Sequence, residues 1–429
     1  MIRLRIEKES GFYKIGSRLP GLVLAGLVLV GIMQPRALHA EERVETHKAE
    51  WGSEGSAAGQ MAEQMGSEMA SGMRRLILTA AEAAGAAKAA AKEAEEQARS
   101  YDFTLGFAGD ICLGDNYIPM QHQEAIGSED ISDGIDPRFI EIMRGMDQMW
   151  INNEFVYSRR GAPLDGKAWT FCGDPDNVSY LKDLGVDIVG LANNHTFDFG
   201  EESFLDTLET LEEAEIPYVG AGRNIKQAAA PVYLETDGFR IAYVAASRAE
   251  YTIYTPEATD TEPGILWCYD YDRFLESIEE AAANADYVIA LPHWGVEHST
   301  ELEDEQIYGA HACIDAGADA VIGAHPHILQ GLEYYEGKPI LYSLGNFWFD
   351  DYDIDTMVAQ LQIKGKRAEG DAPLKDAEVE LRLYPGTQSG VYTALADTDE
   401  WKSRILQDLE NISVNVRIDE DGVVHPASQ

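Results

Sequence analysis

Short apolar runs alternate with amphipathic stretches over most of the chain beyond residue 100. The apolar runs are bounded by polar residues or glycine and predict buried strands. They cover residues 103–108, 149–152, 186–191, 287–291 and 320–322. The amphipathic stretches repeat their apolar residues with helical spacing and predict helices. They cover residues 178–184, 201–214, 272–283 and 303–316.

Two later segments, residues 231–245 and 331–344, have the pattern of β-hairpins. Their centres are Asp237-Gly238 and Glu336-Gly337, and such dipeptides suit tight turns that require positive φ. Strands that alternate with helices and are followed by hairpins are typical of mixed sheets that pack together under helices. The pattern therefore predicts an α/β fold with mixed sheets.

The N-terminal segment has the layout of an export signal, with basic residues before an apolar run at 19–33. The basic residues are Arg3, Arg5, Lys8, Lys14 and Arg18. Their position predicts a cytoplasmic N-terminus and an extracytoplasmic main domain at the cell membrane. Residues 37–40 resemble a cleavage site, but Leu38 is large where a small residue is preferred. Residues 1–40 are therefore predicted to be an uncleaved membrane anchor, and a cleaved signal peptide is the alternative.

Residues 41–100 are rich in Ala, Glu and Met, and 80–99 consist almost entirely of strong helix formers. They have no broad stripe of Leu, Ile or Val to bury. This composition predicts a helical or partly disordered stalk, with a short coiled coil as the alternative. The main domain is expected at 101–385, followed by a C-terminal extension at 386–429 that packs on it.

The chain has a formal net charge of -42 and no basic block that offsets it. Nucleic acid is therefore not expected as a partner, because its phosphates require clustered Lys and Arg. An acidic surface most often serves solubility, and it repels anionic polymers unless cations screen it. The four cysteines lie far apart and form no C-x-x-C pair, so they are interpreted as buried small apolar residues.

Polar or ionisable residues directly follow all five predicted strands, in segments 107–110, 150–154, 190–195, 290–293 and 322–327. Strand ends are where α/β sheets assemble sites, because the loops converge there while the strands stay rigid. The candidate ligands are Asp110, Glu154, Asn194, His195, His293, His325 and His327. This mixture of oxygen and nitrogen donors suits Mn, Zn or Fe better than Mg or Ca.

The segment His325-Pro326-His327 is the most informative of the five. Imidazoles two positions apart can both face a metal centre if the residue between them bends the chain, and proline fixes such a bend. Taken singly, other candidates have ordinary explanations: Asp110 as a turn residue, and Glu154 as an exposed charge at a strand end. The set taken together favours a metal site.

Five motifs resemble those of the CapA family of capsule biosynthesis proteins. They are residues 109–114, 192–195 with Asp198 and Gly200, 293–295 with Glu297, 323–327, and 337–347. The resemblance covers about residues 103–350. It implies a metallophosphatase-like four-layer αββα sandwich with a binuclear metal site, behind an N-terminal membrane anchor and stalk. It also implies a link to the synthesis or export of a poly-γ-glutamate capsule.

The resemblance assigns roles to the candidate ligands. In the family pattern the first metal is bound by Asp110 and His327, both metals are bridged by Glu154, and the second metal is bound by Asn194, His293 and His325. His195 would be the acid that protonates a leaving oxygen. Asp198 is placed to orient the ring of His195, and a loop-capping hydrogen bond is its alternative role.

Three further residues of these motifs, Trp294, Glu297 and Asn346, are candidates for substrate binding. For Trp294 a place in the core is the alternative. The chain departs from the metallophosphatase pattern at Cys112, where those enzymes have a histidine. A Cys112 side chain in the core would leave the first metal with one ligand fewer, and Asp115 is the candidate replacement. The departure weakens the case for phosphatase activity more than that for metal binding.

Three functional hypotheses follow. The first is an anchored, metal-dependent hydrolase or transferase that uses two divalent ions and acts on a phosphorylated or γ-linked glutamyl polymer during capsule assembly. The second is a non-catalytic accessory subunit that binds the polymer or the membrane synthase. The third is a general phosphodiesterase. The expected partners are an anionic extracellular polymer, membrane-embedded synthase or export subunits, and the membrane itself through the N-terminal segment.

Overall fold

The computed structural model describes residues 7–9 and 12–14, helical residues between 67 and 88, and residues 99–427 apart from 250–253 and 368–376. The chain divides into two compact units, Met1–Arg99 and Ser100–Gln429. The described part of the first unit contains the hairpin β1 (Glu7–Glu9) and β2 (Phe12–Lys14), and helix at 78–86. Among the described residues no helix is long and apolar enough to cross a membrane. The apolar run at 19–33, on which the predicted anchor depends, lies outside them.

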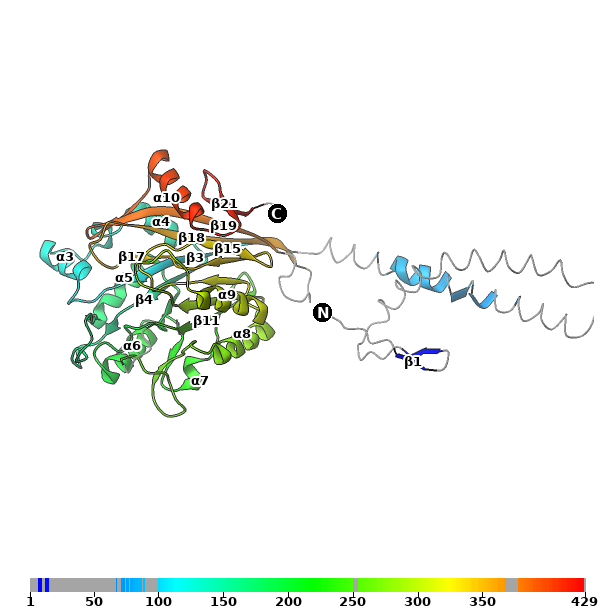
Figure 1. The fold of residues 1–429 in the computed structure, drawn as a ribbon, viewed down its shortest axis with the longest axis horizontal. Coiled ribbons are helices and arrows are strands. Elements are labelled where there is room, and N and C mark those ends of the chain that lie inside the picture. Colours follow the sequence, from blue (N-terminus) through cyan, green and yellow to red (C-terminus); the bar gives the residue numbers. More distant parts are fainter. Residues whose placement is uncertain are drawn as a thin grey trace, which may run out of the picture. The chain divides into compact units, whose positions relative to one another are not determined.

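Two large sheets form the second unit (Figure 1). The first has the order β21-β22-β19-β18-β3-β4-β7-β8, with β17 beside β3 and β20 beside β19. Its strands are β3 (Arg99–Ile111), β4 (Gln148–Asn153), β7 (Ile188–Gly190), β8 (Tyr218–Val219), β17 (Asn346–Trp348), β18 (Ile354–Arg367), β19 (Glu378–Ser389), β20 (Tyr392–Leu395), β21 (Val416–Ile418) and β22 (Val423–Pro426). We call it the ten-stranded sheet.

The second sheet, which we call the six-stranded sheet, has the order β10-β11-β13-β14-β16-β15. Its strands are β10 (Val232–Thr236), β11 (Phe239–Ser247), β13 (Tyr287–His293), β14 (Ala320–Ile322), β15 (Leu332–Tyr335) and β16 (Lys338–Leu341). Its central strands run parallel and its two edge strands run antiparallel. The ten-stranded sheet likewise combines parallel and antiparallel pairs, so the predicted α/β fold with mixed sheets is confirmed.

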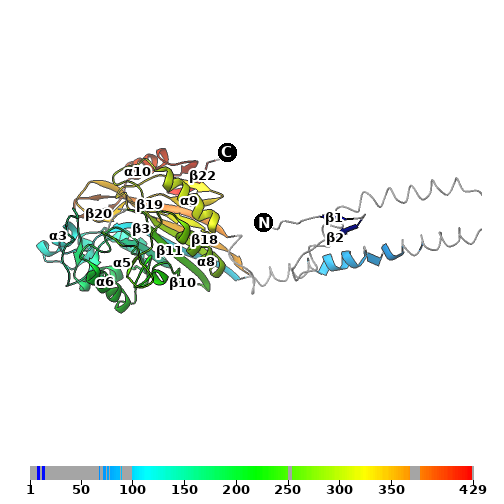
Figure 2. The same ribbon diagram turned by 60° about the horizontal axis from the view of Figure 1, so that its bottom comes forward.

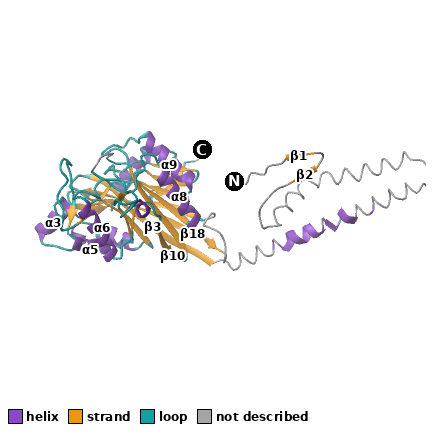
Figure 3. Cartoon of the chain, turned by 90° about the horizontal axis from the view of Figure 1, so that it is seen from below, coloured by secondary structure: helices purple, strands orange, loops and turns teal. Residues whose placement is uncertain are grey.

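Helices cover the outer faces of both sheets and the strands occupy the interior (Figure 3), while the C-terminal helix packs against the cluster between the sheets. The helices are α3 (Ile118–Ile126), α4 (Pro137–Arg144), α5 (Val178–Leu184), α6 (Glu201–Glu213), α7 (Ile225–Ala228), α8 (Asp272–Asn284), α9 (Asp304–Ala316) and α10 (Asp399–Asn411). Alternate side chains of one strand serve different layers. In β3, Phe107 packs between the sheets while Ala108 packs against the helices, and in β13 the same holds for Ile289 and Ala290.

The elements predicted from periodicity lie where the patterns placed them. The helix at 178–184 and the strand at 320–322 match to the residue, and both hairpins form with positive φ at their turn residues. The antiparallel pair of β18 and β19 was not predicted. The two strands run side by side over most of their length (Figure 2). Residues 386–429 contribute β20, β21 and β22 to the ten-stranded sheet, and α10 packs on that sheet.

The parallel strands bring polar residues to one edge. Asp110 lies near the end of β3, Glu154 follows β4, and Asn194 lies in the loop after β7. From the six-stranded sheet, His293 is the last residue of β13 and His325 follows β14. Because parallel strands end at the same edge, these residues from distant parts of the sequence converge.

A close backbone contact beside Asp110 requires glycine. A Cβ atom at Gly109 would lie 1.8 Å from the carbonyl oxygen of Gly345, and the amide of Asp110 donates to that same oxygen at 2.9 Å. Backbone atoms cannot move aside as the end of a flexible side chain can. Gly109 therefore permits the approach that places β17 next to Asp110.

We predict that Gly109→Ala destabilises the second unit by about 3 kcal/mol or more, because the clash is with backbone in a buried strand. The measurement is the free energy of unfolding from urea titration. Gly145→Ala is the matched control: Gly145 has a right-handed helical backbone, and its added Cβ would approach Glu141 O no closer than 3.2 Å. Equal stability losses in the two variants would contradict the role given to Gly109.

Candidate metal centre

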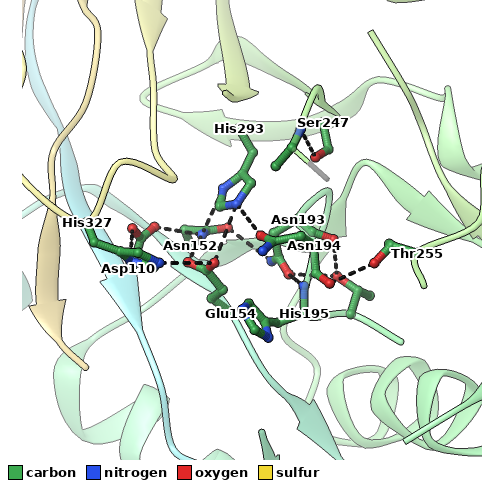
Figure 4. Close-up of polar contacts among 12 residues, drawn as sticks. Asp110, Asn152, Glu154, Asn193, Asn194, His195, Ser247, Thr255, His293 and His327 are labelled. Atoms are coloured by element: carbon green, nitrogen blue, oxygen red, sulfur yellow. Dashed lines mark hydrogen bonds and ion pairs between the residues drawn. The ribbon is translucent and has the colours of Figure 1, made fainter. Parts of the chain in front are cut away.

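Two groups of buried side chains converge at the strand ends (Figure 4). Asp110, Glu154 and His327 form the first group, and Glu154, His293 and His325 form the second. Within each group one ligand-type atom per residue lies within 4.8 Å of the others. Glu154 belongs to both groups, which is the arrangement expected of a carboxylate between two cations.

The two carboxylates are linked by an amide that sequence reasoning did not single out. The Nδ2 atom of Asn152 donates to Asp110 Oδ1 at 2.7 Å and to Glu154 Oε2 at 3.1 Å, and it lies 3.3 Å from His293 Nδ1. Burial, followed by the charge of Asp110, raises the pKa of Glu154 well above its ordinary value. Asn152 lies on β4, two residues before Glu154. Residues two apart in an extended chain point to the same side, and this spacing could have identified Asn152 from the sequence.

His293 and His325 present neutral imidazoles to the site. Burial, followed by neighbouring histidines, lowers the pKa of both well below the ordinary value, and a neutral ring is the form that binds a metal. His293 Nε2 lies 2.8 Å from Asn194 Oδ1 and 3.5 Å from Glu154 Oε1, so the three atoms lie close enough to bind one cation. Asn194 thus joins the second group.

The segment His325-Pro326-His327 bends as its proline suggested. His325 and His327 both have positive φ, 102° and 60°, and their ring centroids lie 6.1 Å apart. Non-glycine residues rarely adopt this backbone region, and such strain clusters at functional sites. Each imidazole thereby reaches a different ligand group.

Asn346 does not lie where a substrate would contact it. It is fully buried behind His327, accepts from His327 Nδ1 at 2.7 Å and donates to Asp350 Oδ2 at 2.9 Å. Burial lowers the pKa of His327, but the nearby Asp110 carboxylate, 3.3 Å from Nδ1, and the hydrogen bond to Asn346 outweigh this effect and raise the net pKa. The prediction of substrate binding by Asn346 is therefore corrected: Asn346 orients a candidate metal ligand.

Several ligand atoms in the described part of the chain lack a hydrogen-bond partner although they are buried. They are Asp110 Oδ2, Glu154 Oε1, Asn194 Nδ2 and His325 Nδ1. Buried polar atoms without partners are costly, and buried carboxylates are normally paired or coordinate metals. The carboxylate and imidazole atoms among them fit divalent cations with mixed oxygen and nitrogen donors.

His195 lies beside the two groups and is oriented by Asp198. Its Nδ1 atom is 2.6 Å from Asp198 Oδ2, and the second carboxylate oxygen of Asp198 accepts from Lys167 Nζ at 2.7 Å. Burial lowers the pKa of His195, although Asp198 opposes the effect. The loop-capping alternative is also realised in part, because Asp198 Oδ2 accepts from the amide of Phe171 at 2.7 Å. Lys167 was not predicted, because it lies in an irregular loop.

Two other substrate-binding candidates lie in different environments. Trp294 is fully buried in the cluster under helices α8 and α9, and its indole N–H donates to Tyr342 O at 3.0 Å. It belongs to the core, which corrects its assignment to substrate binding. Glu297 is exposed in the loop after β13, and its charge raises the pKa of both Glu154 and His327. Of these three candidates, only Glu297 is exposed, and its role in substrate binding stays a prediction.

Cys112 points into the core. Its side chain is fully buried in the cluster between the ten-stranded sheet and its helices, and burial raises the pKa of the thiol. Asp115 does not replace it, because its carboxylate accepts from the Asp174 amide and from Asn177 Nδ2 and so holds a loop. The first group therefore has three protein ligands: Asp110, Glu154 and His327.

Comparison with known proteins places the chain in a family. The family model described as "Bacterial capsule synthesis protein PGA_cap" matches residues 104–351, more than half of the 429-residue chain. The "Capsule biosynthesis protein CapA" of Bacillus anthracis is 36% identical over 224 residues, which are 51% of this chain and 53% of that protein. The "PGA biosynthesis protein CapA" of Bacillus subtilis (strain 168) is 33% identical over 247 residues, which are 57% of this chain and 62% of that protein.

A "probable polyglutamine synthesis accessory protein" of Mycobacterium tuberculosis is 33% identical over 213 residues, 47% of this chain and 55% of that protein. The chain thus spans about half to three fifths of the length of these relatives. Among solved structures, a phosphatase of Mycoplasma pneumoniae matches with a TM-score of 0.40 and 11% identity, covering 68% of this chain and 96% of that one. The sequence comparisons establish that the chain belongs to the PGA_cap family of bacterial capsule synthesis proteins and that it is related to the CapA proteins of Bacillus.

Proposed function

We propose that the chain is a metal-dependent hydrolase or transferase of capsule synthesis that acts on a poly-γ-glutamate-type polymer. The observation that carries the proposal is the sharing of Glu154 between two buried ligand groups, with His195 beside them. The family membership and the names of the Bacillus relatives support the choice of polymer. Those names refer to capsule or PGA biosynthesis, and we extend this role to the present chain as part of the proposal.

The proposed binuclear centre uses the six metal ligands that the family resemblance implies. Asp110, Glu154 and His327 would hold the first cation, and Glu154, Asn194, His293 and His325 would hold the second. The mixed donor set favours Mn, Zn or Fe. Two such cations supply Lewis acidity and neutralise the negative charge that develops on a phosphoryl or acyl group.

The chain's own chemistry centres on His195. Its Nδ1 atom faces Asp198, so its Nε2 atom is the one available to a substrate. In this position Nε2 of His195 would take up the proton that an attacking water loses and deliver it to the leaving oxygen or nitrogen, and general acid–base catalysis of this kind accelerates a reaction by about 10²- to 10⁴-fold. The His195 ring is buried, and its centroid lies 4.5 Å from that of the Phe171 ring. This contact excludes bulk water from one side of the imidazole.

An anionic polymer meets an acidic protein in this proposal. The net charge is -42, and Glu297 places a further carboxylate on a loop close enough to act on Glu154 and His327. Cations bound by these ligand groups would reverse the local field, so that a polymer carboxylate or phosphate could approach. Polymer binding is therefore expected to require the metals.

We also propose that the domain acts outside the cell membrane, held there by residues 1–40 and carried on a stalk formed by 41–100. The basic residues before the apolar run at 19–33 support this orientation. Membrane-embedded synthase or export subunits would then be its partners, because a growing polymer has to leave the cell at the membrane.

A second candidate function is favoured by Cys112. With that side chain in the core, the first ligand group has only three protein ligands and holds its cation less firmly. A centre that is filled at one position would suit an accessory subunit that binds polymer or synthase without turnover. The Mycobacterium tuberculosis relative, which is named as an accessory protein, is in line with this candidate.

Metal content provides the first test. We predict that the full chain binds two Mn²⁺ ions and that Mn²⁺ stabilises it by about 2.7 kcal/mol for each ion at a free concentration 100 times the Kd of its site. Asn152→Ala should weaken binding by about 10- to 100-fold, because the amide orients Asp110, Glu154 and His293.

Elemental analysis and calorimetry measure both effects. Asn153→Ala is the control, since the Asn153 amide donates to backbone at Phe155 O and contacts none of the ligands. Wild-type protein that binds no divalent ion would contradict the metal proposal.

Turnover provides the second test. We predict that His195→Ala lowers kcat by about 10²- to 10⁴-fold on γ-glutamyl oligomers or on bis(p-nitrophenyl) phosphate, with metal content unchanged. His311→Ala, on α9 and paired with Glu333 at 3.0 Å, is the control that keeps full activity.

The outcomes separate the candidate functions. Metal-loaded wild-type protein that turns over neither substrate would favour the accessory role, provided that His195→Ala still supports capsule formation in cells. Activity on the phosphodiester alone would indicate a general phosphodiesterase.

Localisation provides the third test. We predict that protease added to intact cells degrades the domain beyond residue 100, and that deletion of residues 1–40 keeps the protein in the cytoplasm. Immunoblotting of fractions detects both results. A full chain that stays protected in intact cells and is degraded only after lysis would refute the extracytoplasmic proposal.

A further inference from the structure

Lys167 is a buried cation beside the candidate centre. It lies in the loop between β5 (Val156–Tyr157) and β6 (Cys172–Gly173), and its side chain is only 3% exposed. Lysine is almost never buried to this extent unless its charge is paired. Here the partner is the fully buried carboxylate of Asp198, 2.7 Å from Nζ.

The Lys167 ammonium group donates hydrogen bonds to two residues of the candidate centre, Asn194 and Asp198. Lys167 Nζ donates to Asp198 Oδ1 and also to the backbone carbonyl of Asn194, which accepts from Thr255 Oγ1 as well. The Asn194 side chain faces His293, and Asp198 faces His195. A single side chain is therefore in contact with a candidate metal ligand and with the partner of the proposed acid.

Hydrogen-bond capacity determines what this contact does. An ammonium group has donors only, so the Asp198 oxygen that faces it has to accept. The other oxygen accepts from the amide of Phe171 at 2.7 Å, which fixes the carboxylate as an acceptor on both sides. His195 Nδ1 must then carry the proton and donate to Asp198, which leaves Nε2 directed away from the carboxylate.

We propose that Lys167 is a positioning residue: through Asp198 it sets the tautomer and orientation in which His195 serves the site. The catalytic meaning of this assignment rests on the proposed function, whereas the tautomer of His195 does not depend on any activity.

A double-mutant cycle tests the catalytic meaning. On bis(p-nitrophenyl) phosphate with Mn²⁺, Lys167→Met should lower kcat by about 10- to 100-fold with little change in KM, the range typical of residues that orient a catalytic group. In a His195→Ala background the same change should cost less than about twofold, because the acid it positions is absent. Lys167→Arg should recover part of the loss, since the guanidinium keeps the charge and donors.

Lys226→Met, at an exposed position, is the control and keeps wild-type kcat. Equal losses from Lys167→Met in the two backgrounds would overturn the proposal and indicate a role independent of His195. A Lys167→Met loss confined to KM would overturn it as well.

Nitrogen NMR of the full chain with ¹⁵N-labelled histidine tests the positioning without turnover. The His195 resonances, assigned by their loss in His195→Gln, should show the Nδ1–H tautomer in the wild type and in Lys167→Arg, and should depart from it in Lys167→Met. An unchanged His195 tautomer in Lys167→Met would refute the assignment. If the wild type turns over no substrate, the proposed function fails, and the NMR result still decides the role of Lys167.

Discussion

Two carboxylates, Asp110 and Glu154, are buried at the edge where the two sheets meet, and their mutual repulsion is the constraint on which the site depends. The pKa of Glu154 rises through burial and through Asp110, and one oxygen of each carboxylate lacks a hydrogen-bond partner among the described residues. Buried charge of this kind is retained when cations compensate it. Burial keeps the imidazoles of His293 and His325 neutral, whereas Asp110 and Asn346 raise the pKa of His327.

The remainder of the fold holds these groups against their repulsion. The parallel strands β3, β4, β13 and β14 end at one edge, and Gly109 lets β17 approach closely enough to place Asn346 behind His327. Asn152 ties the carboxylates together, and Lys167 ties Asp198 to the Asn194 backbone. These polar links lie one layer outside the ligands and fix the direction in which each ligand points.

The burial of Cys112 makes the two candidate ligand groups unequal. Its burial leaves the first ligand group with three protein residues, while the second group keeps four through Asn194. A difference in metal affinity between the two positions follows from the ligand count. Under the proposed function, the acidic protein would meet an anionic polymer, and occupancy of the weaker position would control how strongly the centre attracts it.

Sequence alone determined the alternation of strands and helices, both hairpin turns, the identity of the candidate ligands and the family resemblance. These features are local, because periodicity, turn chemistry and motifs are written in neighbouring residues. Tertiary structure alone decided that Trp294 turns into the core, that Asn346 orients His327, that Cys112 is not a ligand and that Lys167 reaches Asp198 from a loop 31 residues away. Which face of a strand end a side chain occupies, and which distant loop lies against it, depend on packing between layers, and packing is not encoded in the spacing of residues along one segment.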